Sequence, residues 1–169
     1  MIILIGSHGT GKTTLLEELE KITNQFVISD GYGRPVREAG DKLGLSQYQR
    51  QVIINTLTKH RWNKEIRQKN YVCTRSIIDE WVYCKAFGHD DLLEERKQIF
   101  RDSNFGANKY FYIPVEFPLE EDGIRYSGAA LQKQCDDLMV EWIKEFNLEV
   151  VELRGSVEER LQTLLKHIV

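Results

Sequence analysis

The amino-terminal residues have the types and spacing needed to bind the phosphates of a nucleotide. Eight consecutive residues match the pattern G-x-x-x-x-G-K-[ST] without a mismatch: Gly6, Ser7, His8, Gly9, Thr10, Gly11, Lys12 and Thr13. Glycines allow positive φ angles, so the backbone amides turn inward and meet phosphate oxygens together with the helix N-terminus that follows. This loop, with Thr14 behind it, is therefore predicted to bind ATP.

Two side chains of the loop have predicted roles in chemistry. Lys12 would place its ammonium group at the β- and γ-phosphates, and the hydroxyl of Thr13 would coordinate Mg²⁺, which neutralises charge on a transferred phosphoryl group. His8 belongs to the loop, but a single loop histidine is usually solvent-facing or a local hydrogen-bonding residue, so no chemistry is predicted for it. The alternative is a simple glycine turn at the start of a helix, and it is disfavoured because both the pattern and its position between a strand and a helix agree.

The elements that must position this loop alternate between strand and helix. Residues 2–5 are wholly apolar, which is typical of a strand buried on both faces, and the apolar residues after Lys12 recur at helical spacing to about Asn24. Further strands are predicted at 26–28, 71–73, 110–113 and 150–153, with helices at 46–69, 78–87, 90–100 and 129–146. Residues 31–45 are rich in glycine and charge and are predicted to form a loop.

A last helix is predicted from Ser156, because Ser156 and Glu159 have the spacing of a capping box. Short apolar strands that alternate with helices predict a parallel sheet with right-handed crossovers. The expected fold is α/β, a three-layer P-loop NTPase fold whose five-stranded parallel sheet is flanked by helices. Residues 1–169 are expected to form a single domain.

The composition excludes several classes of protein. The net charge of −3 disfavours a surface that coats duplex nucleic acid. Three scattered cysteines, Cys73, Cys84 and Cys135, have no metal-ligand spacing and disfavour a disulfide scaffold or a zinc site. No apolar run approaches the roughly 18 residues of a membrane span. We expect a soluble protein of the cytoplasm.

Several motifs together resemble those of small P-loop kinases. Beside the opening loop, the likeness rests on Arg75-Ser76 after the third strand, on residues 118–125 and on residues 155–160. The chain is similar to the ATPase-domain family that includes nicotinamide riboside kinase domains, and more loosely to deoxynucleoside and thymidylate kinases, including phage-type enzymes. The resemblance implies ATP with Mg²⁺ and an acceptor bound across the top of the strands.

The same resemblance suggests residues on the acceptor side. In such kinases an acidic residue at the end of the second strand acts as a base or metal partner, and Asp30 occupies that place. Ligands of open α/β sheets bind beyond the carboxyl ends of strands, which independently favours this position. Alternatively, Asp30 only forms an Asp-Gly turn. Arg37 resembles the acceptor-loop arginine of the family, and Arg34 could do the same work.

Arg75 lies at the mouth of a strand, where a guanidinium group can clamp a phosphate or hold the acceptor loop. Many relatives carry an acidic residue just before the Arg-Ser pair, whereas this chain has Thr74. Asp30 or Asp79 would then have to replace the missing carboxylate. Asp79 is a candidate for substrate binding, and it is equally a first-turn helix residue favoured by the macrodipole.

The polar residues 116–128 are a candidate lid, because a loop of that length in a small domain is usually functional. Arg125 is its only arginine and would stabilise transition-state charge, unless it is a surface arginine paired with a neighbouring carboxylate. Arg154 follows the fifth strand, where related kinases hold the adenine base. As part of a helix entry, the same residue needs no ligand.

Three functions fit these motifs. The first is an ATP-dependent phosphotransferase, a kinase that moves the γ-phosphoryl group to a hydroxyl of a nucleoside, nucleotide or related small acceptor. The second is a kinase acting on nucleic acid, such as a hydroxymethylated base in DNA, which would have to be single-stranded or flipped. The basic residues from Lys59 to Arg67 with Trp62 among them favour it if the indole stacks on a base, although such a run is usually a solvated face. The third is an ATP-hydrolysing switch.

Overall fold

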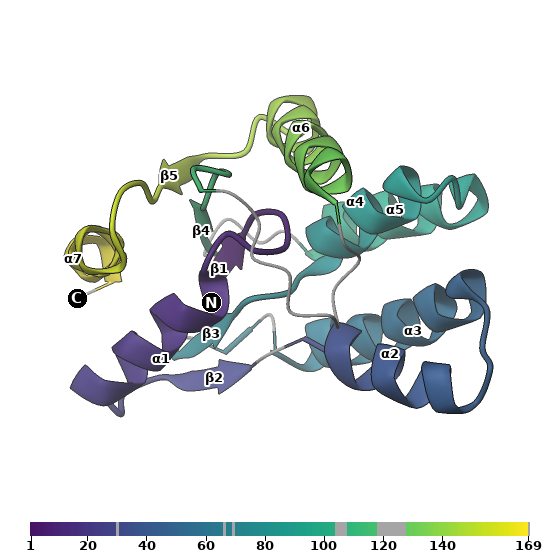
Figure 1. Cartoon of the computed structure of the whole chain (residues 1–169). Coiled ribbons are helices and arrows are strands. Elements are labelled where there is room, and N and C mark those ends of the chain that lie inside the picture. Colours follow the sequence, from purple (N-terminus) through teal and green to yellow (C-terminus); the bar gives the residue numbers. More distant parts are fainter. Residues whose placement is uncertain (30, 66, 69, 104–107, 118–127, 169) are drawn as a thin grey trace.

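The computed structural model describes the chain apart from residues 30, 66, 69, 104–107, 118–127 and 169 (Figure 1). Its strands form one sheet with the order β2-β3-β1-β4-β5, and every pairing is parallel. The strands are β1 (Ile2–Ile5), β2 (Val27–Ser29), β3 (Tyr71–Cys73), β4 (Lys109–Tyr112) and β5 (Val150–Glu152). The predicted five-stranded parallel sheet, with the first strand at its centre, is confirmed.

Helices connect the strands and cover both faces of the sheet. They are α1 (Lys12–Ile22), α2 (Gly33–Lys42), α3 (Gln47–Glu65), α4 (Ile77–Ala86), α5 (Leu93–Ser103), α6 (Ala129–Glu145) and α7 (Val157–Ile168), with a short 3-10 helix η1 (Asp90–Leu92) before α5. The capping box predicted at the start of α7 is present, because Ser156 N donates to Glu159 Oε2 at 2.7 Å and Glu159 N donates to Ser156 Oγ at 3.3 Å.

The prediction of a loop over residues 31–45 was wrong for most of its length, because α2 occupies Gly33–Lys42. Pro35 is the third residue of this helix, where the missing N–H needs no partner inside the helix. Only Gly40 of α2 is fully buried, so the sequence has almost no buried apolar pattern from which this helix could be predicted. It is held to α3 instead by Arg50, whose Nη1 donates to Asp41 at 2.6 Å and whose Nε donates to the carbonyl oxygen of Leu45 at 2.8 Å.

The core consists of two apolar layers separated by the sheet. Along β1 the side chains alternate, so that Ile3 and Ile5 face a layer containing Trp81 and Trp142, while neighbouring residues face α1 and α7. The helices α4 and α6 therefore lie on one side of the sheet, and α1 and α7 on the other (Figure 1). This double cover fixes β1 on both faces and with it the start of the loop that follows.

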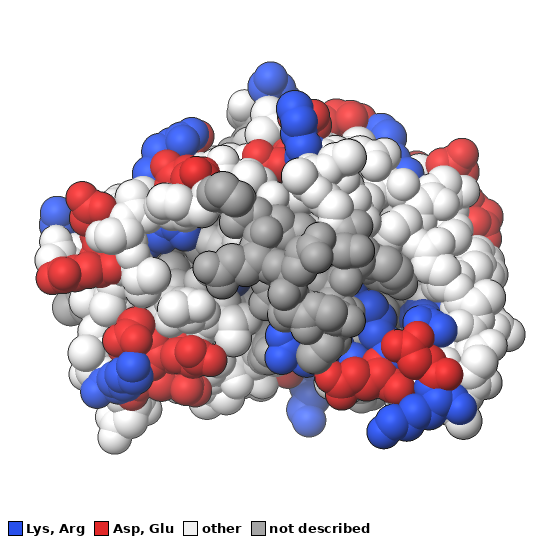
Figure 2. All heavy atoms as spheres, in the orientation of Figure 1, with Lys and Arg blue, Asp and Glu red and all other residues white. Residues whose placement is uncertain are grey.

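The face of the molecule in Figure 2 is mixed in charge. Lys and Arg side chains are interspersed with Asp and Glu side chains over the described residues on the face that Figure 2 shows. Across the described ranges, no helix combines the length and the apolar character that crossing a membrane requires.

Candidate functional site

The loop between β1 and α1 has the backbone that its glycines predict. Gly6, Gly9 and Gly11 have φ angles of 147°, 74° and 87°. A Cβ atom on Gly6 would lie 2.4 Å from the carbonyl oxygen of Ile113, so a side chain does not fit there. Gly11 is the left-handed N-cap of α1 and makes no side-chain capping bond. The first turn of α1 therefore keeps its amides for a ligand, as in a phosphate-binding nest.

Lys12 is folded over this loop. Its Nζ donates to the carbonyl oxygens of Gly6 and Ser7, each at 2.6 Å, and to Thr10 Oγ1 at 3.3 Å. The side chain is buried, whereas the following Thr13 is exposed. The positive charge of Lys12 is thus held against the backbone of the loop, and the hydroxyl of Thr13 lies on the solvent side.

Two helices brace the loop from outside. Gln132 of α6 donates from Nε2 to the carbonyl oxygen of His8 at 2.9 Å, and Arg160 of α7 donates from Nη1 to the carbonyl oxygen of Thr10 at 2.7 Å. His8 is itself buried, with Nδ1 at 3.2 Å from the hydroxyl of Tyr83. His8 therefore has a hydrogen-bonding role, but its partner lies on α4 and not in the loop itself.

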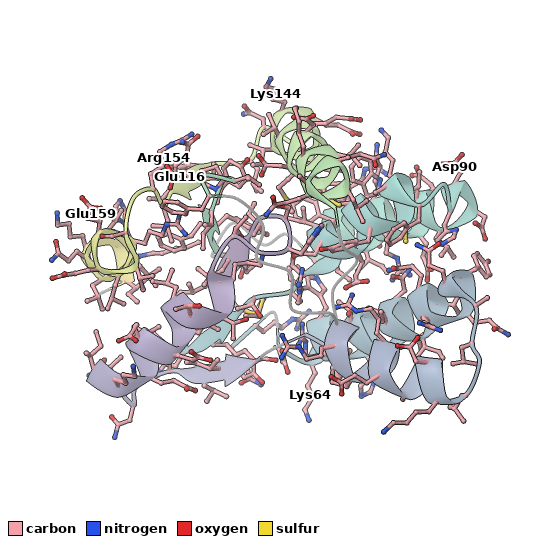
Figure 3. The ribbon with its side chains drawn as sticks, in the orientation of Figure 1. Lys64, Asp90, Glu116, Lys144, Arg154 and Glu159 are labelled. Carbon is pink, nitrogen blue, oxygen red and sulfur yellow. The ribbon has the colours of Figure 1, made fainter. Side chains whose placement is uncertain are left out.

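A carboxylate that the sequence analysis missed joins the phosphate loop to the start of α7. Glu116 accepts from Arg160 Nη2 at 2.8 Å, from Gly155 N at 2.8 Å and from Arg154 Nη1 at 3.5 Å (Figure 3). Burial alone would raise the pKa of Glu116, but the hydrogen bonds from Arg160 and Gly155 outweigh it and hold the pKa below the usual value. Glu116 thus connects the loop predicted to hold adenine with the loop predicted to hold phosphate.

Arg160 could have been found from its spacing. Val157, Leu161 and Leu164 lie on the apolar face of α7, and Arg160 lies among them while only 3% exposed. A charged residue on a buried helix face needs a partner, and here the partners are Glu116 and the backbone of Thr10. Arg154, in contrast, is exposed and also donates to Glu152 at 2.7 Å.

On the acceptor side, the carboxyl ends of β2 and β3 lie together. A Cβ atom on Gly31 would be 2.0 Å from Cγ of Arg75, so the backbone after β2 lies directly against that side chain. Arg61 of α3 donates from Nη1 to Ser29 Oγ at 3.0 Å and from Nη2 to the carbonyl oxygen of Arg75 at 2.6 Å. Asp30 and Arg125, two of the predicted catalytic residues, lie outside the described residues, as does most of the predicted lid.

Asp79 forms a capping box with Ser76 at the start of α4. Its Oδ2 accepts from the backbone N and from Oγ of Ser76, each at 2.9 Å, while its Oδ1 lies 3.7 Å from Nη1 of Arg75. The side chain is only 1% exposed. The structure thus shows the first-turn helix role that was one interpretation of Asp79, and its role in substrate binding stays a prediction.

Tyr83 of α4 lies between the two sides of the site. Its hydroxyl contacts His8 of the phosphate loop, and its ring centre is 5.8 Å from the guanidinium carbon of Arg75. The remaining predicted acceptor residues are on α2, one turn apart. Arg34 is exposed, and Arg37 is half-buried with its guanidinium group beside Gly33.

The basic run on α3 does not form an aromatic platform. Trp62 is 2% exposed, and its Nε1 donates to Ser103 Oγ at 2.6 Å, so the prediction that its indole could stack on a nucleobase is wrong. Arg61 is buried too, and Lys59 pairs with Glu95 at 2.7 Å. A groove of about 500 Å³ lies between α3 and α5, and none of the predicted site residues lines it.

A buried polar cluster between α3 and α4 also escaped the sequence analysis. Glu80 is 3% exposed and accepts from Gln51 Nε2 at 2.9 Å and from Thr58 Oγ1 at 3.3 Å. Burial, reinforced by the negative charge of Asp79, raises the pKa of Glu80 to about 7. The signal in the sequence was a second carboxylate, next to Asp79, between the apolar pairs Ile77-Ile78 and Trp81-Val82 of α4.

The comparisons with known proteins agree with this geometry. In fold, the chain is similar to deoxyadenosine kinase from M. mycoides, with a TM-score of 0.71, 13% identity, and coverage of 98% of this chain and 96% of that chain. It is also similar to thymidylate kinase from Ehrlichia chaffeensis, with a TM-score of 0.64, 17% identity, and coverage of 99% and 97%. The NadR protein in complex with NR gives a TM-score of 0.71 at 16% identity, over 99% of this chain and 50% of that chain.

At these low identities, the structural matches establish a likeness of fold alone. No curated protein matches the sequence significantly. A family model described as an AAA domain, however, matches residues 1–160. Since that match spans most of the 169 residues, this chain belongs to the AAA domain family.

Proposed function

We propose that the chain is an ATP-dependent kinase that transfers the γ-phosphoryl group to a hydroxyl of a nucleoside or nucleotide. The observation that carries this proposal is the pairing of a lysine-centred phosphate loop with Arg75, which lies across from it at the end of β3. Deoxyadenosine kinase, thymidylate kinase and a NadR protein in complex with NAD and AMP-PNP share the fold, which supports this class of acceptor.

On the donor side, inward-turned amides and the ammonium group of Lys12 bind the triphosphate. The exposed hydroxyl of Thr13 is a hard oxygen donor of the kind that Mg²⁺ accepts. Among the residues with described positions, no group of three His, Cys, Asp or Glu side chains could hold a metal ion. Thr13, with Asp30 as the second predicted ligand, would hold Mg²⁺ beside the phosphates, where the ion would neutralise their charge.

On the acceptor side, Asp30 accepts the proton of the attacking hydroxyl. The new bond forms between that oxygen and the γ-phosphorus, the bond from phosphorus to the β-γ bridging oxygen breaks, and ADP leaves. Ser29 and Gly31, the neighbours of Asp30, contact Arg61 and Arg75, which supports its placement near the acceptor. Arg75 and Arg125 stabilise charge on the transferred group, and Arg34 and Arg37 hold the acceptor.

Arg154 and the turn after it supply the adenine end of the ATP site in this proposal. Glu116 supports that assignment, because it bonds both to this turn and to the arginine that braces the phosphate loop. An acceptor within a polynucleotide is not proposed, since the aromatic residue that favoured it is buried.

The direct test is to incubate the protein with Mg²⁺ and ATP labelled at the γ-phosphate, against separate pools of nucleosides, nucleotides and oligonucleotides. We expect the label in a nucleoside or nucleotide and its loss from that product in Asp30→Asn. Label only in oligonucleotides would identify a nucleic acid kinase, and label only in free phosphate would identify an ATP-hydrolysing switch. Either result would overturn the proposal.

A further inference from the structure

The side chain of Arg61 crosses from α3 to the ends of two strands. Its two terminal nitrogens diverge, one to Ser29 Oγ at the end of β2 and the other to the carbonyl oxygen of Arg75 just past β3. We propose that Arg61 is a positioning residue for phosphoryl transfer, because it fixes these two strand ends in the relative position that the acceptor side requires. The inference rests on the proposed function.

Arg61 is built into the structure rather than lying on its surface. Its side chain is 6% exposed, and its Nε lies 3.5 Å from Glu65, one turn further along α3. Glu65 in turn accepts from the hydroxyl of Tyr71 at 2.8 Å. The buried charge therefore has a counter-charge and hydrogen-bond acceptors, which is the condition for keeping it in one place.

Arg61 contacts the chain at the point where the pairing of β2 with β3 ends. The register between β2 and β3 ends with Ser29 opposite Cys73, and one further bond follows, from Thr74 N to the carbonyl oxygen of Ser29 at 3.3 Å. Arg61 bonds to the side chain of Ser29, the last paired residue of β2, and to the carbonyl oxygen of Arg75, the residue after Thr74. Its guanidinium carbon also lies 5.1 Å from the ring centre of Tyr32, which leads into α2.

These contacts involve the two residues that flank the proposed base in the sequence. Ser29 precedes it and is bonded to Arg61, whereas Gly31 follows it and lies against Arg75. The side chain of Arg75 thus packs against Gly31, and the carbonyl oxygen of Arg75 is held by Arg61. The phosphate loop, in contrast, is braced by Gln132 and Arg160. Loss of the two diverging hydrogen bonds of Arg61 should therefore disturb the acceptor side and spare ATP binding.

Arg61→Lys tests these two hydrogen bonds, because a lysine keeps the charge but has one nitrogen in place of two diverging donors. We expect kcat to fall about 10- to 100-fold with the KM for ATP unchanged, since small displacements of reacting groups have effects of that size. Ser29→Ala removes the contact of Arg61 to β2 together with the hydrogen bond between Ser29 and Tyr71, and should lower kcat in the same direction. If Arg61→Lys does not fold, Ser29→Ala tests the inference in its place.

The matched control is Arg96→Lys on α5. Arg96 is as buried as Arg61 and also bonds to α3, through the carbonyl oxygen of Asn55 at 3.2 Å, but it touches neither strand end. We expect it to keep the kcat of the wild type. An equal loss of kcat in this control, or a matching rise in the KM for ATP in Arg61→Lys, would reduce Arg61 to a general structural residue and overturn the inference.

A second measurement separates this inference from the proposed function. Backbone amide hydrogen exchange needs no acceptor, and it should become faster at Gly31, Tyr32 and Arg75 in Arg61→Lys but not in Arg96→Lys. If the wild type phosphorylates no nucleoside or nucleotide, the proposed function fails, and the exchange rates still decide whether Arg61 holds the strand ends. Unchanged exchange at these three residues in Arg61→Lys would overturn the inference.

Discussion

Arg160 and Thr10 are 150 residues apart in sequence, yet Nη1 of the arginine donates to the carbonyl oxygen of the threonine at 2.7 Å. The second terminal nitrogen of Arg160 donates to Glu116 at 2.8 Å. The shape of the phosphate loop is therefore set from outside the motif, by the last helix and by Glu116, the first residue of the predicted lid. A Cβ atom on Gly11 would lie 3.3 Å from the same guanidinium group, so the loop and Arg160 are closely packed.

Glu116→Gln should weaken ATP binding. Loss of the carboxylate leaves the buried Arg160 without its counter-charge, and hydrogen bonds to charged groups contribute about 1.5 to 3 kcal/mol. We expect the Kd for a non-hydrolysable ATP analogue to rise about 10-fold in calorimetric titration, with the KM for the acceptor unchanged. Glu158→Gln, at an exposed position in the first turn of α7, is the control and should bind as the wild type does. Equal affinity in both variants would show that Glu116 does not shape the ATP site.

Lys12→Ala should remove most phosphoryl transfer. The ammonium group is the charge that the loop carbonyls hold in place, and preorganised charge is worth far more in a site than in water. We expect the rate of transfer to fall at least about 100-fold, while the far-ultraviolet circular dichroism spectrum stays that of the wild type. Lys21→Ala, at the exposed end of the same helix, should retain the rate. An active Lys12→Ala protein would remove the role assigned to this residue.

Gly31→Ala should impair the acceptor side. The new methyl group would lie 2.0 Å from Cγ and 2.7 Å from Cβ of Arg75, so the strand end or the arginine has to move. We expect kcat to fall about 10- to 100-fold, whereas the Kd for the ATP analogue stays constant. Gly33→Ala is a control two residues away, because its Cβ would meet only the tip of Arg37 at 3.4 Å or more. Wild-type kcat in Gly31→Ala would show that the contact with Arg75 has no part in transfer.

The sequence predicted the features that are local in the chain. The phosphate loop is eight adjacent residues with a fixed backbone requirement, and the strands are short apolar runs buried on both faces. By contrast, the contacts of Arg61 and Arg160 depend on which helix packs against which strand end. The periodicity of a helix indicates only that such a residue faces inward. It does not identify the partner of that residue. Trp62 was misinterpreted for a related reason, because its charged neighbours concealed the buried face of α3.

The buried carboxyl of Glu80 should make stability depend on pH. Its pKa is about 7 in the folded protein against 4.5 for an ordinary glutamate. At a pH well below 4.5 the carboxyl is protonated in both the folded and the unfolded chain. Between pH 4.5 and 7 only the folded chain retains the proton, so its contribution to the free energy of unfolding falls as the pH rises through this window and then becomes constant. The total change corresponds to roughly 3 kcal/mol.

Glu80→Gln removes this titration while keeping an amide of the same shape beside Gln51 and Thr58. The variant should therefore gain stability relative to the wild type as the pH is raised from 5 to 8, because the wild type alone has to bury a charge at the higher pH. Urea unfolding at several pH values measures this difference directly. Glu20→Gln, at an exposed position of α1, should show a constant difference over the same range. A constant difference for Glu80→Gln as well would mean that this carboxyl titrates like an exposed one, and that water reaches the space between α3 and α4.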